Sequence, residues 1–259
     1  MYDMGTRRQA LTLVAQGHSL NSASRATGAS RSAIRSWQSR VDPLPRMRST
    51  PCSRCGPLTE APPDTAAYSY LLGLYLGDGC ISPGKQRAGH FLRIACADHW
   101  PGLIEACAAA VEAVNPNRRS SRVRAGGYVS VVAYSRHWPC LFPQHGPGKK
   151  HERPIVLEPW QQEIVGVHPW EFVRGLIHSD GCRITNWTTR VVGGERKRYE
   201  YPRYFFTNVS DDIRRLYTDT LDTLGVRWTH CTRGGNPYNI SVARRASVAL
   251  MDAHVGPKY

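Results

Sequence analysis

Two aspartates, Asp78 and Asp180, each follow an apolar stretch and precede a glycine, and they lie 102 residues apart. The stretches read YLLGLYLGDG (70–79) and FVRGLIHSDG (172–181), so the chain carries an internal repeat. Each aspartate falls in the last turn of a predicted helix, where the helix dipole disfavours a carboxylate. A local rule broken twice at equivalent positions indicates a functional site. Paired helix ends would offer carboxylate and carbonyl oxygens to a hard divalent cation.

The helices that carry these aspartates are predicted to be buried and to pack face to face. Gly73 and Gly77 lie one turn apart, and Gly175 with Ser179 repeats the spacing, so each helix has a stripe where another backbone can approach. The glycine after each aspartate is predicted to end its helix in the left-handed conformation. One copy alone would equally suit a plain buried helix that ends in an Asp-Gly turn, but two copies favour a site.

The rest of each repeat predicts helix, two strands, helix, two strands, helix. Predicted strands cover 80–82, 91–96 and 128–134 in the first half and 183–188, 201–209, 227–232 and 238–243 in the second, with helices at 101–114 and 211–224. The matching loops at the ends of the halves are 109 residues apart, seven more than the aspartates. We expect the insertion in a longer hairpin at 192–201.

Lysine is scarce in this chain, with five residues against 29 arginines, and three of the five lie in the two matching loops. The loops read LFPQHGPGKK (141–150) and LMDAHVGPK (250–258). A compact ammonium on a flexible stem suits a place beside a phosphate, or a proton donor. Lys149, Lys150 and Lys258 are therefore candidate catalytic residues; a solvated basic loop is the alternative.

Composition indicates a globular protein with a polyanionic partner. The 259 residues are 41% hydrophobic with a formal net charge of +14, which favours nucleic acid first and an anionic membrane surface second. The longest apolar run is too short to span a bilayer, and the N-terminus lacks a signal-peptide pattern. Eight scattered cysteines suit a reducing compartment. We expect a cytoplasmic protein, associated with the nucleoid when bound to DNA.

Residues 1–41 are predicted to form a small helical domain. Ser19 and Gly28 provide a cap and a turn, and the stretch that contains them resembles a helix-turn-helix. The resemblance implies that Arg31, Ser32 and Arg35 face DNA from the recognition helix. A helical dimerisation or docking module is the alternative.

Residues 42–64 are predicted to be a linker, since six prolines fall between 41 and 63. Cys52 and Cys55 within it form a CxxC pair, which can present two thiolates to Zn²⁺, although a closed site needs four ligands. Two free thiols are the alternative.

The duplicated motif resembles the LAGLIDADG motif of homing endonucleases, and the resemblance covers about 66–259. It implies an α+β fold of duplicated half-domains (αββαββα), here 65–164 and 165–259, with pseudo-two-fold symmetry. The two motif helices would form the central interface of a single-chain monomer. Two curved antiparallel sheets would form a saddle over the major groove of double-stranded DNA.

The resemblance also implies roles for residues at matching positions. Asp78 and Asp180 become metal-binding carboxylates, with Gly79 and Gly181 beside them, and Mg²⁺ as the ion, with Mn²⁺ as a substitute. Lys149 or Lys150, and Lys258, become basic residues beside the scissile phosphates. The residues expected to contact DNA from the half-domains are Lys85, Arg87, Arg93, Arg122, Arg124, Arg183, Arg190, Arg198 and Arg203.

The chain departs from the commoner acidic motif at Leu76 and His178, which precede the aspartates. Cys80 and Cys182 follow the motifs, and we expect them to be small buried residues at strand starts.

Two function classes follow. The first is a site-specific double-strand DNA endonuclease of homing type that hydrolyses phosphodiester bonds with a metal. The second is a non-cleaving, sequence-specific transcription regulator on the same scaffold, as in some bacterial sporulation regulators. Paired anions beside phosphate have no use in a pure binder, which favours the nuclease. No splicing blocks flank the repeat, so an intein is not expected.

Overall fold

The computed structural model describes residues 4–39, 62–84, 89–116, 119–232 and 238–259, in two compact units, Met1–Ser53 and Arg54–Tyr259. The predicted linker contains the boundary between the units. Among the described residues, no helix has the length and apolar character needed to cross a membrane.

The first unit contains three helices: α1 (Met4–Ala15), α2 (Leu20–Thr27) and α3 (Arg31–Ser39). Ser19 accepts a hydrogen bond from the Ser22 amide at 3.2 Å, which caps α2 as predicted, and Gly28 takes the positive φ of 68° that its turn requires. The helices pack around small and apolar side chains, which are Ala10, Ala23, Ala29, Ile34 and Trp37. Assignment as a helix-turn-helix stays a prediction.

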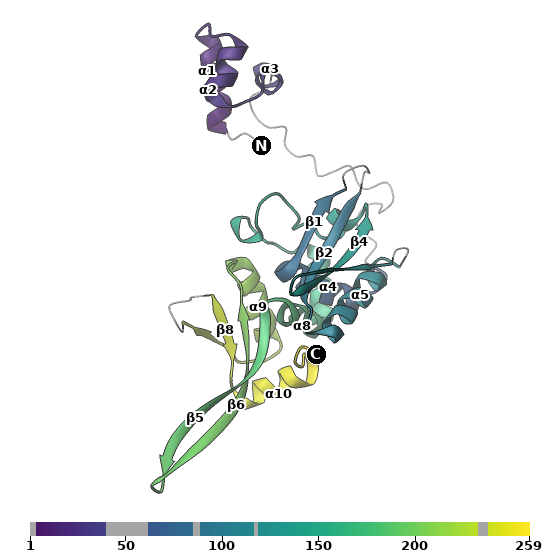
Figure 1. Cartoon of the computed structure of the whole chain (residues 1–259), viewed down its shortest axis with the longest axis vertical. Helices are drawn as coiled ribbons and strands as arrows, with labels where there is room; N and C mark the ends of the chain where they lie inside the picture. The colour runs from purple at the N-terminus through teal and green to yellow at the C-terminus, as the bar shows by residue number, and fades with distance from the viewer. Residues whose placement is uncertain (1–3, 40–61, 85–88, 117–118, 233–237) are drawn as a thin grey trace. The chain divides into compact units, whose positions relative to one another are not determined.

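The second unit begins with α4 (Thr65–Asp78), β1 (Gly79–Pro83), β2 (His90–Ala97), α5 (Pro101–Val114), β3 (Ser121–Ala125), β4 (Tyr128–Ser135), α6 (Trp138–Leu141) and the 3₁₀ helix η1 (Lys150–Glu152). It continues with α7 (Pro159–Val167), α8 (Pro169–Asp180), β5 (Gly181–Val192), β6 (Glu195–Thr207), α9 (Asp211–Thr223), β7 (Thr229–Cys231), β8 (Asn239–Val242) and α10 (Arg245–His254) (Figure 1). The predicted mixture of helices and antiparallel strands is confirmed.

The strands form two four-stranded antiparallel sheets with orders β1-β2-β4-β3 and β5-β6-β8-β7. Both orders place the third strand of the half at the edge, so the halves share a topology. Pseudo-two-fold symmetry stays a prediction. Helices α4 and α5 contact the first sheet, and α8 and α10 contact the second. We call the side of each sheet away from these helices its open face.

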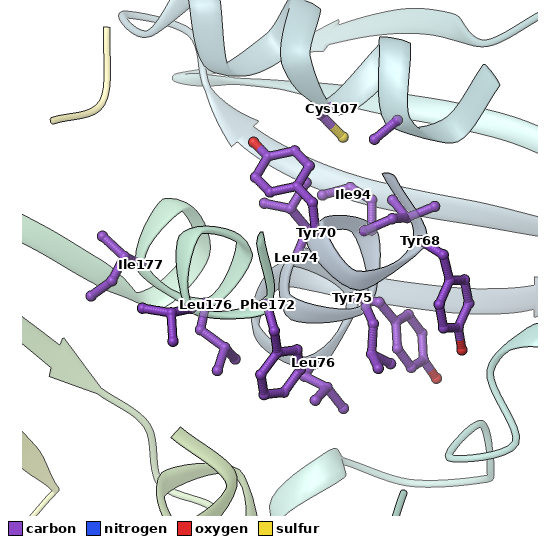
Figure 2. Close-up of a cluster of buried hydrophobic side chains, with 14 of the residues drawn as sticks. Tyr68, Tyr70, Leu74, Tyr75, Leu76, Ile94, Cys107, Phe172, Leu176 and Ile177 are labelled. Carbon is purple, nitrogen blue, oxygen red and sulfur yellow. The ribbon is translucent and has the colours of Figure 1, made fainter. Parts of the chain in front are cut away.

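The two motif helices pack against each other at the centre of the unit (Figure 2). The predicted glycine stripe makes this contact close: a Cβ on Gly175 would lie 2.1 Å from the carbonyl oxygen of Tyr70, and one on Gly73 would lie 2.5 Å from that of Phe172. No side chain fits there. Apolar side chains bury the remaining surface of α4, whose residues from Tyr68 to Leu76 are all buried.

The expected left-handed glycines after the aspartates are not found. Gly79 has φ −89° and ψ 147°, and Gly181 has φ −111° and ψ 173°, so each helix passes directly into an extended strand. Glycine is required for a different reason. A Cβ on Gly79 would lie 2.5 Å from the Cα of Tyr75, and one on Gly181 would lie 2.8 Å from the Cα of Ile177.

The predicted insertion in the second half is a long hairpin. Strands β5 and β6 have 12 and 13 residues, whereas β1 and β2 have 5 and 8. The register continues to Val192 opposite Glu195, well past the end of β8 at Val242. Figure 1 shows this hairpin extending beyond the rest of its sheet.

Candidate functional site

The two aspartates end adjacent helices and line one cavity. At their junction, a Cβ on Gly77 would lie 2.2 Å from the Oγ of Ser179 and 3.0 Å from the Oδ2 of Asp180. Asp78 and Asp180 both line a cavity of about 510 Å³. The repeat therefore brings together two carboxylates that are far apart in the sequence.

Asp78 is exposed on one side and Asp180 is half-buried, and partial burial of their carboxyl groups makes both weaker acids. Partial burial raises the pKa of Asp78 to about 6, and the charge of Asp180 adds to the effect, while Lys258 and Lys150 oppose it. Burial also raises the pKa of Asp180, against a side-chain hydrogen bond from Asn208 and both lysine charges. The cluster thus holds two anions and two cations in a site that favours their neutral forms.

Lys150 occupies the end of α4. Its Nζ donates to the carbonyl oxygens of Gly77 and Gly79, both at 2.7 Å, and to that of Tyr75. Burial lowers the pKa of Lys150 to about 8, although Asp180 and Asp78 oppose this shift. The carbonyl oxygens of Gly77 and Gly79 lie in the last turn of α4 and just beyond it, where helical partners are lacking, whereas that of Tyr75 also accepts from the Gly79 amide. An ammonium ion is thus bound by three backbone oxygens beside the aspartates.

Lys258 occupies the end of α8. Its Nζ donates to the carbonyl oxygen of Ser179 at 2.9 Å. Burial lowers the pKa of Lys258, and the charges of Asp78 and Asp180 oppose the shift. Each motif helix therefore has one lysine at its carboxyl end.

Lys149 lies outside this cluster of charges. Its Nζ is 3.9 Å from Oε1 of Glu152, and its side chain is 73% exposed. The sequence left the choice between Lys149 and Lys150 open, and the geometry favours Lys150 as the site residue.

Two residues of the site were not identified from the sequence. Asn208 donates from Nδ2 to Oδ2 of Asp180 at 2.5 Å. Gly181 pairs with Phe206, two residues before Asn208, and Gly79 pairs with Ile94, two residues before Cys96. Cys96 is therefore the first-half counterpart of Asn208, so the halves differ beside their aspartates. Comparing the two hairpins at this offset would have selected Asn208. Arg153 bridges the first lysine loop through the carbonyl oxygens of Gln144, Pro147 and Gly148, and no sequence pattern marks it.

Two predicted DNA-contacting arginines lie on the open faces beside aromatic rings. In β2, the guanidinium of Arg93 is 5.1 Å from the ring centre of Phe91. In β6, the guanidinium of Arg203 is 4.9 Å from that of Phe205 and 5.8 Å from that of Tyr201. Basic groups held over rings are suited to contact with a nucleic acid.

Two other arginines lie on the helix side of their sheets. Arg122 pairs with Val131, which is fully buried, and its Nε donates to Oε1 of Glu105 in α5 at 2.9 Å. Arg183 donates to Asp252 of α10 at 2.6 and 2.9 Å. The expectation that Arg122 belongs to the saddle surface is not supported, because strand register turns it to the other side, and the same geometry applies to Arg183. Arg124 shares the face of Arg122 and is exposed.

The long hairpin of β5 and β6 carries the remaining predicted arginines. Arg190 pairs with Lys197 in the register. Arg198 lies over the ring of Trp187, at 5.0 Å from its centre, and 2.6 Å from Glu200. All of these residues are exposed, so the long hairpin offers basic groups to solvent.

The other predicted residues are placed as follows. In α3, Arg35 is exposed, and the exposed Arg31 donates to Asn21 at 3.1 Å. Cys80 and Cys182 are exposed, so the expectation that they are buried is wrong; β1 and β5 turn them to the open face. Outside the described residues lie the side chain of Ser32 and all of Lys85, Arg87, Cys52 and Cys55.

The oxygens at the helix ends fit a hard divalent cation. Mg²⁺ typically takes one or two carboxylates and completes its shell with water and substrate phosphate. Asp78 and Asp180 supply two carboxylates, and three carbonyl oxygens next to them already bind a cationic group in Lys150. The Gly79 carbonyl, expected beside the metal, is engaged by that lysine. Within the described ranges, no cluster of three or more His, Cys, Asp or Glu side chains could hold a metal.

Comparisons with known proteins find similarity in structure. No family model matches the chain, and no curated protein matches it in sequence. A crystal structure of I-DmoI in complex with DNA and Mn aligns at a TM-score of 0.47 and 14% identity, covering 75% of this chain and 98% of that one.

Two further solved structures give similar values. The I-SmaMI LAGLIDADG homing endonuclease bound to cleaved DNA aligns at 0.45 and 10% identity, covering 70% of this chain and 79% of that one. The N-terminal LAGLIDADG domain of DUF199/WhiA aligns at 0.46 and 11% identity, covering 75% and 83%. The chain is thus similar to LAGLIDADG proteins in structure as well as in its motifs, and likeness at this level assigns no activity.

Proposed function

We propose that this chain is a metal-dependent endonuclease that cuts both strands of double-stranded DNA at one long site. The observation that carries the proposal is the convergence of Asp78, Asp180, Lys150 and Lys258 on two adjoining helix ends. A site for structure alone has no reason to bring two carboxylates together in one cavity and raise the pKa of both.

The four charged groups have complementary tasks. Asp78 and Asp180 would hold Mg²⁺, which when bound neutralises their charge and draws charge from phosphate oxygens. Next to the aspartates, the Nζ of Lys258 would donate to one phosphate as its negative charge grows. The N–H groups of Lys150 already bond three carbonyl oxygens, so Lys150 would act on the other phosphate through its positive charge.

The open faces and the long hairpin provide the surface for DNA. Arg93 and Arg203 lie on the two open faces, and Arg190 and Lys197 extend the basic surface along the hairpin. The major groove admits a two-stranded ribbon, and arginine reads guanine there through two hydrogen bonds. A net charge of +14 supports binding to the phosphate backbone.

The test is cleavage of the DNA that flanks the chain's own coding locus. Wild type should cut both strands in Mg²⁺ or Mn²⁺ and neither strand in EDTA. Asp78→Asn and Asp180→Asn should each bind this DNA at least as tightly as wild type, because each removes an anion that repels phosphate. Their cleavage should fall by orders of magnitude.

The adjacent lysines form a matched pair of variants. Lys150→Met should lose cleavage with little change in affinity, since its Nζ lies at the helix end. Lys149→Met should behave as wild type, because its side chain is exposed outside the charge cluster. Equal losses in the two variants would assign both lysines to a generic basic loop.

A DNA-binding regulator without cleavage is the second candidate, and one observation favours it. Lys150 already fills the carbonyl oxygens at the end of α4, so an internal ammonium partly neutralises the cluster without any metal. If wild type nicks no flanking DNA in either metal, while both Asn variants bind one site as wild type does, the regulator replaces the nuclease.

A further inference from the structure

The last residues of the chain cross from the second half to a helix of the first. Gly256, with φ 70°, turns the backbone after α10, and its amide donates to the carbonyl oxygen of Met251 at 3.1 Å. Three residues later, the carbonyl oxygen of Tyr259 accepts a hydrogen bond from the amide of Leu103 at 3.1 Å. That amide is in the first turn of α5, where it has no helical partner.

The ring of Tyr259 lies directly on Gly102. A Cβ built on Gly102 would be 2.0 Å from both Cδ2 and Cε2 of the ring, which is closer than any side chain permits. The ring is otherwise largely exposed, with Tyr259 as a whole 64% accessible. The contact therefore buries little surface, but it fixes the position of residues 256–259, which we call the C-terminal tail.

Lys258 lies between these two anchor points. Gly256 is attached to the end of α10 on one side, and Tyr259 is attached to α5 on the other. In between, the Nζ of Lys258 reaches the carbonyl oxygen of Ser179 at the end of α8. A side chain with four rotatable bonds reaches a fixed point reproducibly only if its backbone is held.

Lys150 has a separate support within its own half. Arg153 donates to the carbonyl oxygens of Pro147 and Gly148, at 3.1 and 2.8 Å, and so closes the loop that precedes the lysine. None of these contacts involves the C-terminal tail. The two lysines of the site are thus positioned by independent devices.

We propose that Tyr259 is a positioning residue for Lys258, and that its contact with Gly102 and Leu103 of α5 keeps this lysine at the end of α8. The role in DNA cleavage rests on the proposed function, because it assigns Lys258 to one strand. The positioning of Lys258 by Tyr259 does not rest on the proposed function. Displacing Tyr259 moves Lys258 and leaves Lys150 in place.

The direct test measures the acetylation of individual lysines in the full chain, without metal or DNA, by acetic anhydride followed by peptide mass spectrometry. Lys149 and Lys197 are exposed and serve as fast internal references. In wild type, Lys258 and Lys150 should react more slowly than these references. In Tyr259→Ala, Lys258 should react severalfold faster and Lys150 at its wild-type rate.

Gly102→Ala gives the same displacement from the opposite side of the contact. Alanine is a better helix former than glycine, so α5 should be no less stable. Its methyl group nevertheless occupies the space of the Tyr259 ring. Lys258 should become reactive as in Tyr259→Ala, the double variant should show no further increase, and Tyr259→Phe should match wild type.

Strand-specific nicking links the tail to catalysis. Tyr259→Ala and Gly102→Ala should slow the cutting of one strand, so nicked DNA accumulates while affinity and melting temperature stay at wild-type values. Unchanged Lys258 reactivity in both variants would overturn the inference whether or not DNA is cut. Equal slowing of both strands would overturn the assignment to one strand. A wild type that cuts no DNA overturns the proposed function, and the acetylation pattern still decides the inference.

Discussion

The substitution Asp78→Asn should stabilise the protein without metal, although it removes a residue of the proposed site. Asp78 is exposed on one side, but partial burial of its carboxyl group and the charge of Asp180 make its ionised form unfavourable. Asparagine has nearly the same shape and keeps hydrogen-bonding capacity while removing the charge. A residue retained for folding would show the opposite effect.

The magnitude follows from the pKa. A rise from 3.8 to about 6, at roughly 1.4 kcal/mol per unit, would give a buried carboxylate a cost of about 3 kcal/mol. Asp78 is exposed on one side, so solvent screens its charge and reduces this cost to about 1 kcal/mol. The shift already includes the opposing charges of Lys258 and Lys150, so we expect a net gain of up to about 1 kcal/mol. For a folded unit of this size that raises the melting temperature by roughly 2–4 °C.

The sign depends on pH in a defined way. Below about pH 4 the carboxyl is protonated in both the folded and unfolded states, so Asp78→Asn and wild type should melt together. Between about pH 4 and pH 6 the carboxyl ionises in the unfolded state before it does in the folded state, so wild type loses stability. The melting temperature of Asp78→Asn should therefore rise above that of wild type, and we call this difference the gap. Above about pH 6 the gap should stay constant.

The assay is thermal melting from pH 4 to pH 8 in EDTA, repeated with Mg²⁺. A bound ion stabilises the folded state by mass action, so Mg²⁺ should stabilise wild type more than Asp78→Asn and narrow the gap. Asp252→Asn is the control of opposite sign, because Arg183 holds the pKa of Asp252 below its usual range. That control should be less stable than wild type at pH 8. Loss of stability in Asp78→Asn at pH 8, or a gap that ignores pH, would refute the reasoning.

Further predictions concern packing, the hairpin and the first unit. Gly175→Ala places a methyl group 2.1 Å from a backbone oxygen of α4, which should lower the free energy of unfolding by about 3 kcal/mol or prevent folding. Gly166→Ala, where a methyl group would meet open space, should leave the free energy of unfolding unchanged or raise it, as measured by denaturant titration. Changing Arg190 and Lys197 together to Gln should lower the slope of log K against log salt by about 1.8, if each contacts one phosphate; an unchanged slope would remove the hairpin from the interface. Deleting residues 1–40 should weaken DNA binding and flatten its salt dependence while leaving metal-dependent cleavage at high protein concentration. Loss of cleavage in a folded truncated chain would contradict this.

The sequence alone determined those features that depend on local periodicity and on the repeat. The spacing of Gly73 and Gly175 within apolar helices predicted the close contact of α4 and α8, because residues one turn apart share a helix face. The spacing between equivalent positions of the two halves predicted the longer hairpin, because an insertion lengthens every spacing that spans it. Ser19 and Gly28 marked a cap and a turn for equally local reasons.

Only the tertiary structure decided which side chains complete the site. Lys149 and Lys150 are neighbours of the same type, and the turn of the 3₁₀ helix directs one outward and the other to the end of α4. The alternation of β3 placed Arg122 on a face, but only its pairing with β4 showed that helices cover that face. Asn208 reaches Asp180 across 28 residues. Contacts of this kind depend on register and packing between distant segments, which no local pattern encodes.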